Sequence, residues 1–265
     1  SEKDPSCPMR LAELLTEAGL PEGVFNVVNG DKESVDAILE NKDIKAVSFV
    51  GSTPIAKYIY ENSAKNEKRV QALGGAKNHL VVMPDCDLEL AVNECVAGAL
   101  SFNGQRCTAL KVLYVHESIA NEFNKRFSEA VDNLKFGMPW EKDAFLTPLP
   151  EPSKPQYIKD LIEDAIFKGA SVINKKGGKI TDNYCFPAVL FPVNDSMKVF
   201  EEEQFGPVVP IIPFKDIDKP LDDMANSDYG QQVSLFGSDT KKIGPLIDTL
   251  ANLVCRVNLN SSCQR

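Results

Sequence analysis

Apolar and polar residues follow two periods along this chain, and together they predict an α/β protein. Apolar residues spaced three and four apart indicate helices, and short β-branched runs indicate strands. Helices and strands that alternate in this way are typical of a parallel sheet covered on both faces. In the first part of the chain, the predicted helices are residues 6–19, 33–41 and 54–62, and the predicted strands are 24–28, 46–50, 69–73 and 79–83.

A second section begins near Asp87, which is placed to cap a long helix that runs to Leu100. A loop over residues 101–108 then leads into a strand at 110–116 that we interpret as alternating. The proline-rich stretch 147–155 is interpreted as a surface connector. The other predicted helices are 119–134, one that ends at Lys168, 221–226 and 241–250, and the other predicted strands are 208–212, 233–236 and 254–259.

Composition and charge exclude several classes of protein. The 265 residues are 43% hydrophobic and 25% charged, as in ordinary folded proteins, so a largely disordered chain is excluded. The net charge of −9, without a run of five basic residues, argues against nucleic acid or an acidic membrane as a partner. No stretch approaches the roughly 20 apolar residues of a membrane span. The opening residues contain neither an initiator Met nor an apolar signal region, so we expect a fragment of a longer chain.

Cysteine and histidine usage predicts reduced thiols and no metal site. The chain has seven cysteines without a CxxC pair and only two histidines, whereas a zinc site needs closely paired ligands. We therefore expect thiols in a cytoplasmic setting. His79 and His116 border two predicted strands, and we expect both to have structural roles.

The segment from Phe102 to Thr108 presents Cys107 in a loop between a helix and a strand. The thiolate form of cysteine is the nucleophile that attacks carbonyl carbon, and a neighbouring cation such as Arg106 favours it. A buried, inert thiol is the alternative. The residues of this loop alone do not decide between the two.

Two further segments carry candidate binding chemistry. In the segment Phe49–Pro54, Gly51 and Ser52 stand where a strand meets a helix, so the helix N-terminus could hold a phosphate or could simply be capped by a hydroxyl. In the segment Glu201–Pro207, three carboxylates precede an aromatic residue and a Gly-Pro turn. These acids form either a solvated face or a contact to ribose hydroxyls.

The three segments, in this order and spacing, resemble the aldehyde dehydrogenase superfamily over essentially the whole chain. The motifs that carry the resemblance are FVGST at 49–53, GQRC at 104–107 and EEQFGP at 202–207. The resemblance implies an α/β fold in which residues 1–75 are the end of a doubly wound dinucleotide-binding domain and 76–265 are an incomplete α/β catalytic domain. It also implies a small-molecule aldehyde substrate, NAD or NADP as cofactor, and a homo-oligomer, either a dimer or a tetramer.

By this resemblance, Cys107 is the catalytic nucleophile, which forms a thiohemiacetal and then a thioester. Its backbone N–H would supply half of an oxyanion hole. The residues that the resemblance assigns to the cofactor are Glu2 at the adenosine ribose, Gly51 and Ser52 at the pyrophosphate, Glu203 at the nicotinamide ribose, and Phe205 beside the nicotinamide. A carboxylate at position 2 would disfavour a 2′-phosphate.

Two departures from the family pattern concern the acyl acceptor and the substrate. Ala72 stands before Leu-Gly-Gly, where the family usually has the glutamate that activates water, and the segment GAKNH at 75–79 resembles methylmalonate-semialdehyde dehydrogenases, which transfer the acyl group to coenzyme A. The positions of Arg106 and Arg265 resemble those of arginines in the branch of the family that contains non-phosphorylating glyceraldehyde-3-phosphate and succinate-semialdehyde dehydrogenases. Guanidinium groups there hold a phosphate or carboxylate, which predicts an aldehyde with an anionic tail. Three outcomes stay open: release as an acid, transfer to coenzyme A, and an inactive structural relative.

Overall fold

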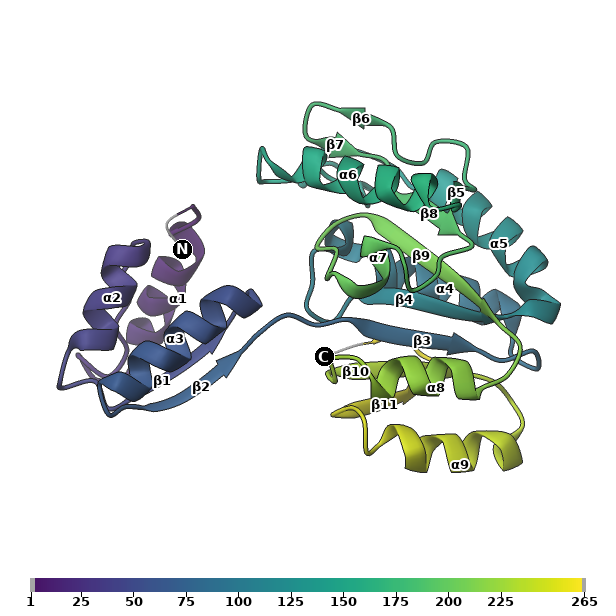
Figure 1. The fold of residues 1–265 in the computed structure, drawn as a ribbon. Helices are drawn as coiled ribbons and strands as arrows, with labels where there is room; N and C mark the ends of the chain where they lie inside the picture. Colours follow the sequence, from purple (N-terminus) through teal and green to yellow (C-terminus); the bar gives the residue numbers. More distant parts are fainter. Residues whose placement is uncertain (1–2, 264–265) are drawn as a thin grey trace. The chain divides into compact units, whose positions relative to one another are not determined.

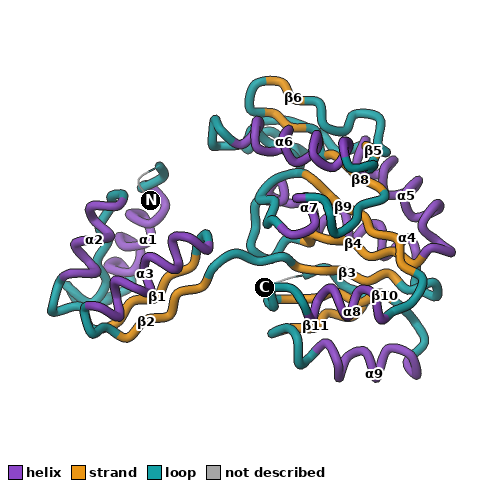
Figure 2. The backbone as a smooth tube through the Cα atoms, viewed as in Figure 1, coloured by secondary structure: helices purple, strands orange, loops and turns teal. Residues whose placement is uncertain are grey.

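The computed structural model describes residues 3–263, and the chain divides into two compact units, Ser1–Gly75 and Ala76–Arg265 (Figures 1 and 2). The first unit contains the helices α1 (Ser6–Glu17), α2 (Lys32–Glu40) and α3 (Thr53–Lys65) and the strands β1 (Ala46–Val50) and β2 (Arg69–Leu73). Their assignment as part of a dinucleotide-binding domain stays a prediction.

The two strands of the first unit form a parallel pair that α3 connects. Ala46 lies opposite Arg69, and Val50 lies opposite Leu73. Alternate residues of both strands are exposed, including 62% of Val50 and 49% of Leu73. Within the described residues α3 packs on the strands while every second side chain of the pair is exposed, so the cover of this sheet on both faces stays a prediction.

The predicted strand at residues 24–28 is also wrong. These residues form a loop between α1 and α2, and Val24 and Val28 are 64% and 67% exposed. Their β-branched composition favours an extended chain, but a strand also needs a hydrogen-bonded neighbour. Among the described residues, none pairs with this segment.

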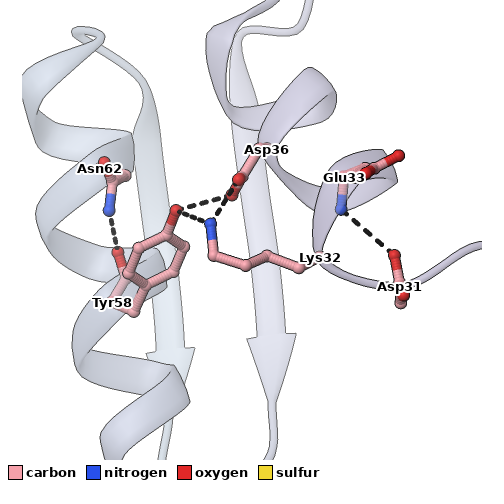
Figure 3. A network of polar contacts seen from close by, with 6 residues as sticks. All are labelled: Asp31, Lys32, Glu33, Asp36, Tyr58 and Asn62. Atoms are coloured by element: carbon pink, nitrogen blue, oxygen red, sulfur yellow. Dashed lines mark hydrogen bonds and ion pairs between the residues drawn. The ribbon is translucent and has the colours of Figure 1, made fainter.

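Polar contacts connect α2 to α3 (Figure 3). The Lys32 ammonium donates to Asp36 at 2.5 Å and to the Tyr58 hydroxyl at 3.0 Å, and that hydroxyl donates to Asp36 at 2.6 Å. These hydrogen bonds raise the pKa of Lys32 and lower the pKa of Asp36. At the start of α2, the Asp31 carboxylate accepts from the Glu33 N–H at 3.4 Å, and on α3 Asn62 donates to the Tyr58 carbonyl at 2.9 Å. The network therefore fixes α2 against α3 through charged groups that remain close to solvent.

The second unit is built on a seven-stranded sheet with the order β11-β10-β3-β4-β9-β8-β5. Only the β5–β8 pair is antiparallel. A separate hairpin joins β6 (Ile180–Thr181) to β7 (Tyr184–Cys185). The strands of the sheet are β3 (Asn78–Val82), β4 (Leu110–His116), β5 (Ser171–Val172), β8 (Ala188–Phe191), β9 (Val208–Phe214), β10 (Gln232–Phe236) and β11 (Arg256–Leu259).

Both faces of this sheet are buried against helices, which gives a doubly covered α/β architecture (Figure 1). Along β3, Leu80 and Val82 pack toward α4 and α5, whereas Val81 packs toward α6, α8 and α9. This alternation follows from the two-residue period of a strand. The helices are α4 (Leu88–Leu100), α5 (Glu117–Asp132), α6 (Lys154–Phe167), α7 (Lys198–Glu201), α8 (Asp218–Ala225) and α9 (Thr240–Leu250), and a short 3₁₀ turn, η1, covers Ser101–Gly104.

Candidate functional site

The loop that carries Cys107 has an unusual backbone. Phe102, Asn103 and Gly104 follow one another with φ angles of 54°, 58° and 70°, in the left-handed region that non-glycine residues seldom occupy. Two hydrogen bonds hold Asn103 in this conformation: its amide donates to the Thr147 hydroxyl at 3.0 Å and accepts from the Thr147 N–H at 2.9 Å. The loop is therefore fixed by the structure around it.

Gly104 brings this loop against the segment that contains Glu203. A Cβ atom at position 104 would lie 2.7 Å from the Gly206 carbonyl oxygen and 2.9 Å from the Ala99 carbonyl oxygen. Only glycine fits there without a backbone shift. The GQRC and EEQFGP motifs, about a hundred residues apart, therefore meet in the second unit.

Asn78, at the start of β3, holds the backbone of Cys107. Its side-chain amide donates to the Cys107 carbonyl at 2.7 Å and to the Ala109 carbonyl at 2.9 Å. Cys107 itself is half-buried, and Asn78 is 1% exposed. Because these two carbonyls are held, the peptide groups that follow Cys107 and Ala109 have a fixed orientation.

The three acids that precede Gln204 differ in exposure. Glu201 and Glu202 are exposed, as expected of a solvated face, whereas Glu203 is half-buried. The Tyr157 hydroxyl donates to the Glu203 carbonyl at 3.4 Å and to the Glu202 carboxylate at 3.3 Å. Phe205 is also half-buried. The roles of Glu203 and Phe205 toward a cofactor stay predictions.

Gln204 and Lys77 form the buried support of this segment. The Lys77 ammonium donates to the Val199 carbonyl at 2.7 Å, to the Glu202 carbonyl at 2.5 Å and to the Gln204 side-chain oxygen at 2.6 Å. The Gln204 amide in turn donates to the Lys111 carbonyl at 2.6 Å. Burial holds the pKa of Lys77 well below its usual range. Lys77 and Gln204 lie within the GAKNH and EEQFGP motifs, but the sequence alone assigns neither of them a role.

Lys111 is a second buried lysine that sequence analysis missed. The strand at 110–116 is predicted to alternate, but nearly every residue of β4 is buried, and Lys111 is 1% exposed. Its ammonium donates to the carbonyls of Gly104 and Gln204 at 3.0 and 3.1 Å. The available signal was a single cation within an apolar run, which in a central parallel strand has no solvent face to occupy.

Arg106 belongs to the Cys107 loop and is half-buried. Its guanidinium donates to the Ser101 hydroxyl at 3.2 Å and lies 5.3 Å from the centre of the Phe102 ring. Both partners belong to the loop itself, so Arg106 packs along the loop, with Phe102 72% exposed beside it. Its recognition of an anionic substrate stays a prediction.

In the first unit, Gly51 and Ser52 stand at the N-terminus of α3. Ser52 occupies the N-cap position, but its hydroxyl makes no capping hydrogen bond. The Thr53 hydroxyl instead accepts from the Gly75 N–H at 3.0 Å, and a Cβ atom at position 74 would lie 2.9 Å from that hydroxyl. The simple alternative, a hydroxyl that caps the helix, therefore does not account for Ser52.

Two predicted site residues, Glu2 and Arg265, lie outside the described residues. Within residues 3–263, no cluster of three or more His, Cys, Asp or Glu side chains is arranged to hold a metal ion. In that same range, no helix is both long and apolar enough to cross a membrane. Two surface pockets of about 610 and 440 Å³ occur in the second unit, and Cys107 lines neither of them.

The two histidines lie at or near the ends of two strands, and their structural roles stay a prediction. The His116 ring accepts from the Ser118 N–H at 3.3 Å and caps α5. His79 is 5% exposed, with its ring centre 6.0 Å from that of Tyr114. Burial, with a smaller contribution from the charge of Lys77, lowers the pKa of His79 from 6.5 to about 3.

This pKa predicts a dependence of stability on pH. Between about pH 3 and 6.5 the unfolded chain binds a proton at His79 that the folded chain does not bind, so the free energy of unfolding increases with pH over this window. The slope from one such group is at most about 1.4 kcal/mol per pH unit. We expect His79→Phe to remove this component, measured as the difference between wild-type and variant urea midpoints from pH 4 to 7. A difference that stays constant across that range would contradict the prediction.

Fold and site together define an α/β protein of the doubly wound class that holds a cysteine loop against an acidic, glycine-containing loop. The family model for the aldehyde dehydrogenase family matches residues 1–265. The chain belongs to the aldehyde dehydrogenase family.

Relatives and solved structures agree with this assignment. Malonate-semialdehyde dehydrogenase from Bacillus cereus is 38% identical over 264 residues, which cover 98% of this chain and 54% of the relative. A putative methylmalonate-semialdehyde dehydrogenase from Sinorhizobium meliloti 1021, complexed with NAD, superposes with a TM-score of 0.93 at 36% identity over 99% of this chain and 54% of the other. The NADP-dependent glyceraldehyde-3-phosphate dehydrogenase from Bacillus halodurans C-125, complexed with NADP, has a TM-score of 0.89 at 35% identity, covering 97% and 52%. The chain thus spans about half the length of the proteins it matches.

Proposed function

We propose that this chain is part of an NAD(P)-dependent enzyme that oxidises a small aldehyde with an anionic tail to its acid. The observation that carries the proposal is the fixed loop of Cys107, which Gly104 brings against the segment of Glu203 and Phe205. Two of the structural relatives, with TM-scores of 0.93 and 0.89, are complexed with NAD and with NADP respectively. Membership of the family supports the aldehyde as substrate class.

The residues that we assign to the cofactor have side chains and backbone groups of the kinds that bind a dinucleotide. Ser52 stands at the N-terminus of α3 with a hydroxyl that does not cap the helix, and helix N-termini bind phosphate groups through N–H groups and dipole. Gly51 and Ser52 would hold the pyrophosphate, and Glu203 would accept from ribose hydroxyls beside Phe205. When bound, the cofactor supplies a hydride acceptor. Glu2 and Arg265 retain the roles that the resemblance assigns to them, at the adenosine ribose and at the anionic tail.

The residues around Cys107 account for the remaining steps. The thiolate sulfur bonds to the aldehyde carbon, and the carbonyl oxygen takes the negative charge near the Cys107 N–H. Loss of hydride from that carbon leaves a thioester on Cys107. Water then breaks the carbon–sulfur bond, so the acid is released and the thiolate is regenerated. Arg106 would bind a carboxylate or phosphate at the far end of the substrate.

Transfer to coenzyme A is the second candidate, because of Ala72. This residue lies in β2, half-buried, and its methyl group cannot accept the proton of an attacking water. In this case the coenzyme A thiolate attacks the thioester carbon and Cys107 leaves. We further propose a homo-oligomer, as the family resemblance implies, and a cytoplasmic location, because the cysteine usage favours reduced thiols.

The proposal is tested by cofactor reduction in the longest form of the protein that contains this chain. We expect absorbance of reduced cofactor at 340 nm with malonate semialdehyde, succinate semialdehyde or glyceraldehyde 3-phosphate. Uncharged aldehydes of equal length serve as controls and are expected to have a higher KM. Equal kcat/KM values for charged and uncharged aldehydes would contradict the anionic substrate. Activity with none of the substrates, although the protein is folded and binds NAD, would favour an inactive structural relative.

A further inference from the structure

Lys111 is a cation in a place where a charge is costly. It is the second residue of β4, and its side chain is among the largest fully buried ones of the chain, with 1% exposed. An ammonium group that leaves water loses several kcal/mol of solvation unless hydrogen bonds and opposite charges replace the solvent. The groups that surround this ammonium therefore indicate what it does.

The polar partners of Lys111 come from the two loops of the candidate site. Its Nζ donates to the Gly104 carbonyl at 3.0 Å and to the Gln204 carbonyl at 3.1 Å, and it lies 4.7 Å from the centre of the Phe205 ring. The Gly104 carbonyl belongs to the Cys107 loop, and Gln204 and Phe205 directly follow Glu203 in the sequence. One side chain therefore connects both loops at the point where Gly104 and Gly206 meet.

The charges around Lys111 are of both signs. Burial lowers its pKa to about 8, Glu203 and Cys107 act in the opposite direction, and Lys154 lowers the pKa further. Lys77 also faces it, because the positive charge of Lys111 lowers the pKa of Lys77. Coulomb interactions are mutual. Because a Cys107 thiolate stabilises the charged form of Lys111, the positive charge of Lys111 stabilises that thiolate by the same free energy.

We propose that Lys111 is a positioning residue that holds the Cys107 loop against the Glu203 segment and stabilises the thiolate of Cys107 with its buried positive charge. The inference rests on the proposed role of Cys107 as the nucleophile. It assigns the charge to a buried residue that lies seven positions beyond Gly104 and donates to the carbonyl of that glycine. Arg106, the cation adjacent in sequence, instead donates to Ser101 and lies over Phe102.

Lys77 offers a matched control for Lys111. It too is a buried lysine that donates to the segment before Phe205, with 2% exposed. Its electrostatic partners are Lys111, Glu203 and Glu202. A variant at Lys77 therefore perturbs the same segment from the other side of Gln204. If the Cys107 thiol responds only to a less ordered Glu203 segment, variants at Lys77 and at Lys111 should change its alkylation equally. If it responds to the charge of Lys111, only the Lys111 variants should change it.

The test is the pH dependence of Cys107 alkylation by iodoacetamide, followed by mass spectrometry of the peptide that contains Cys107. Two variants remove the charge: Lys111→Met, and Lys111→Gln, which still has N–H donors. Lys111→Arg retains the charge, and Lys77→Gln is the control. We expect the alkylation midpoint to rise by about one pH unit or more in the two neutral Lys111 variants. The midpoint should stay near the wild-type value in Lys111→Arg and Lys77→Gln.

An unchanged midpoint in both neutral Lys111 variants overturns the proposal, as does an equal rise in Lys77→Gln. If neither neutral variant folds, as judged by circular dichroism, the wild-type profile decides. A midpoint at or above that of an ordinary thiol, about 8.5, overturns the proposal, and a lower one supports it. Alkylation needs no aldehyde or cofactor, so a failure of the proposed reaction and a failure of this inference are distinguishable.

Discussion

Replacing Cys107 with alanine is expected to abolish aldehyde oxidation, with a fall in kcat of about 10³- to 10⁶-fold, as when other enzymes lose their nucleophile. The physical reason is that no thiohemiacetal forms, so the aldehyde hydrogen does not become a hydride donor. Pre-steady-state absorbance at 340 nm should lose the burst of reduced cofactor that precedes turnover. Binding of NAD, measured by fluorescence quenching, should be retained, because the predicted cofactor contacts are other side chains.

Cys255→Ala is the matched control for this prediction. Cys255 is exposed, lies just before β11 and forms no disulfide. We expect its replacement to leave the burst amplitude at the wild-type level. A Cys107→Ala protein that retains its burst, or an equal loss in both variants, would remove Cys107 from the proposed role.

Much of the framework could be predicted from local patterns. Asp87 was expected to cap the helix that ends at Leu100, and its carboxylate accepts from the Leu90 N–H at 3.1 Å at the start of α4. The strands at 46–50 and 69–73 have the predicted bounds. These elements were predictable because a cap or an apolar run acts over a few residues, and the fold class follows from their order.

The elements between residues 171 and 201 were not predicted, because their form depends on partners distant in sequence. β5 and β6 have two residues each and α7 has four, too few for a period to appear. Ser171 becomes a strand residue only because Phe191 lies antiparallel to it.

The supports of the site were hidden for the same reason. Asn78 contacts the Cys107 carbonyl across 29 residues, and Lys111 contacts the Gln204 carbonyl across 93. The motifs alone identified Cys107 and Glu203 as candidates, but the register of β3 beside β4 and the packing of the Gln204 segment decide what surrounds them. The sequence period does not predict the burial of Lys111, because it does not reveal whether a strand is covered on one face or on both.

Introducing a carboxylate at position 72 is expected to increase the release of the acid to water by about 10²- to 10⁴-fold, the usual contribution of a general base. In the wild-type protein we expect a burst of reduced cofactor, one equivalent per Cys107, followed by slow turnover without coenzyme A. By the role that the family resemblance assigns to position 72, a base there acts on the thioester and not on its formation, so Ala72→Glu should raise the slow phase and leave the burst unchanged. Stopped-flow absorbance at 340 nm separates the two phases.

Ala72→Gln is the control, since it adds a side chain of nearly the same size that cannot take a proton. Residue 72 lies opposite Phe49 in the neighbouring strand. An equal acceleration in Ala72→Gln would show that the size of the side chain, and not base catalysis, increases the rate of hydrolysis. Adding coenzyme A to the wild-type protein then distinguishes the two acceptors. If it raises turnover to the rate of the burst, the thioester is transferred to a thiol and Ala72 explains why water competes poorly. If wild-type turnover is fast without coenzyme A, another group activates water, and the methyl group at position 72 places no limit on hydrolysis.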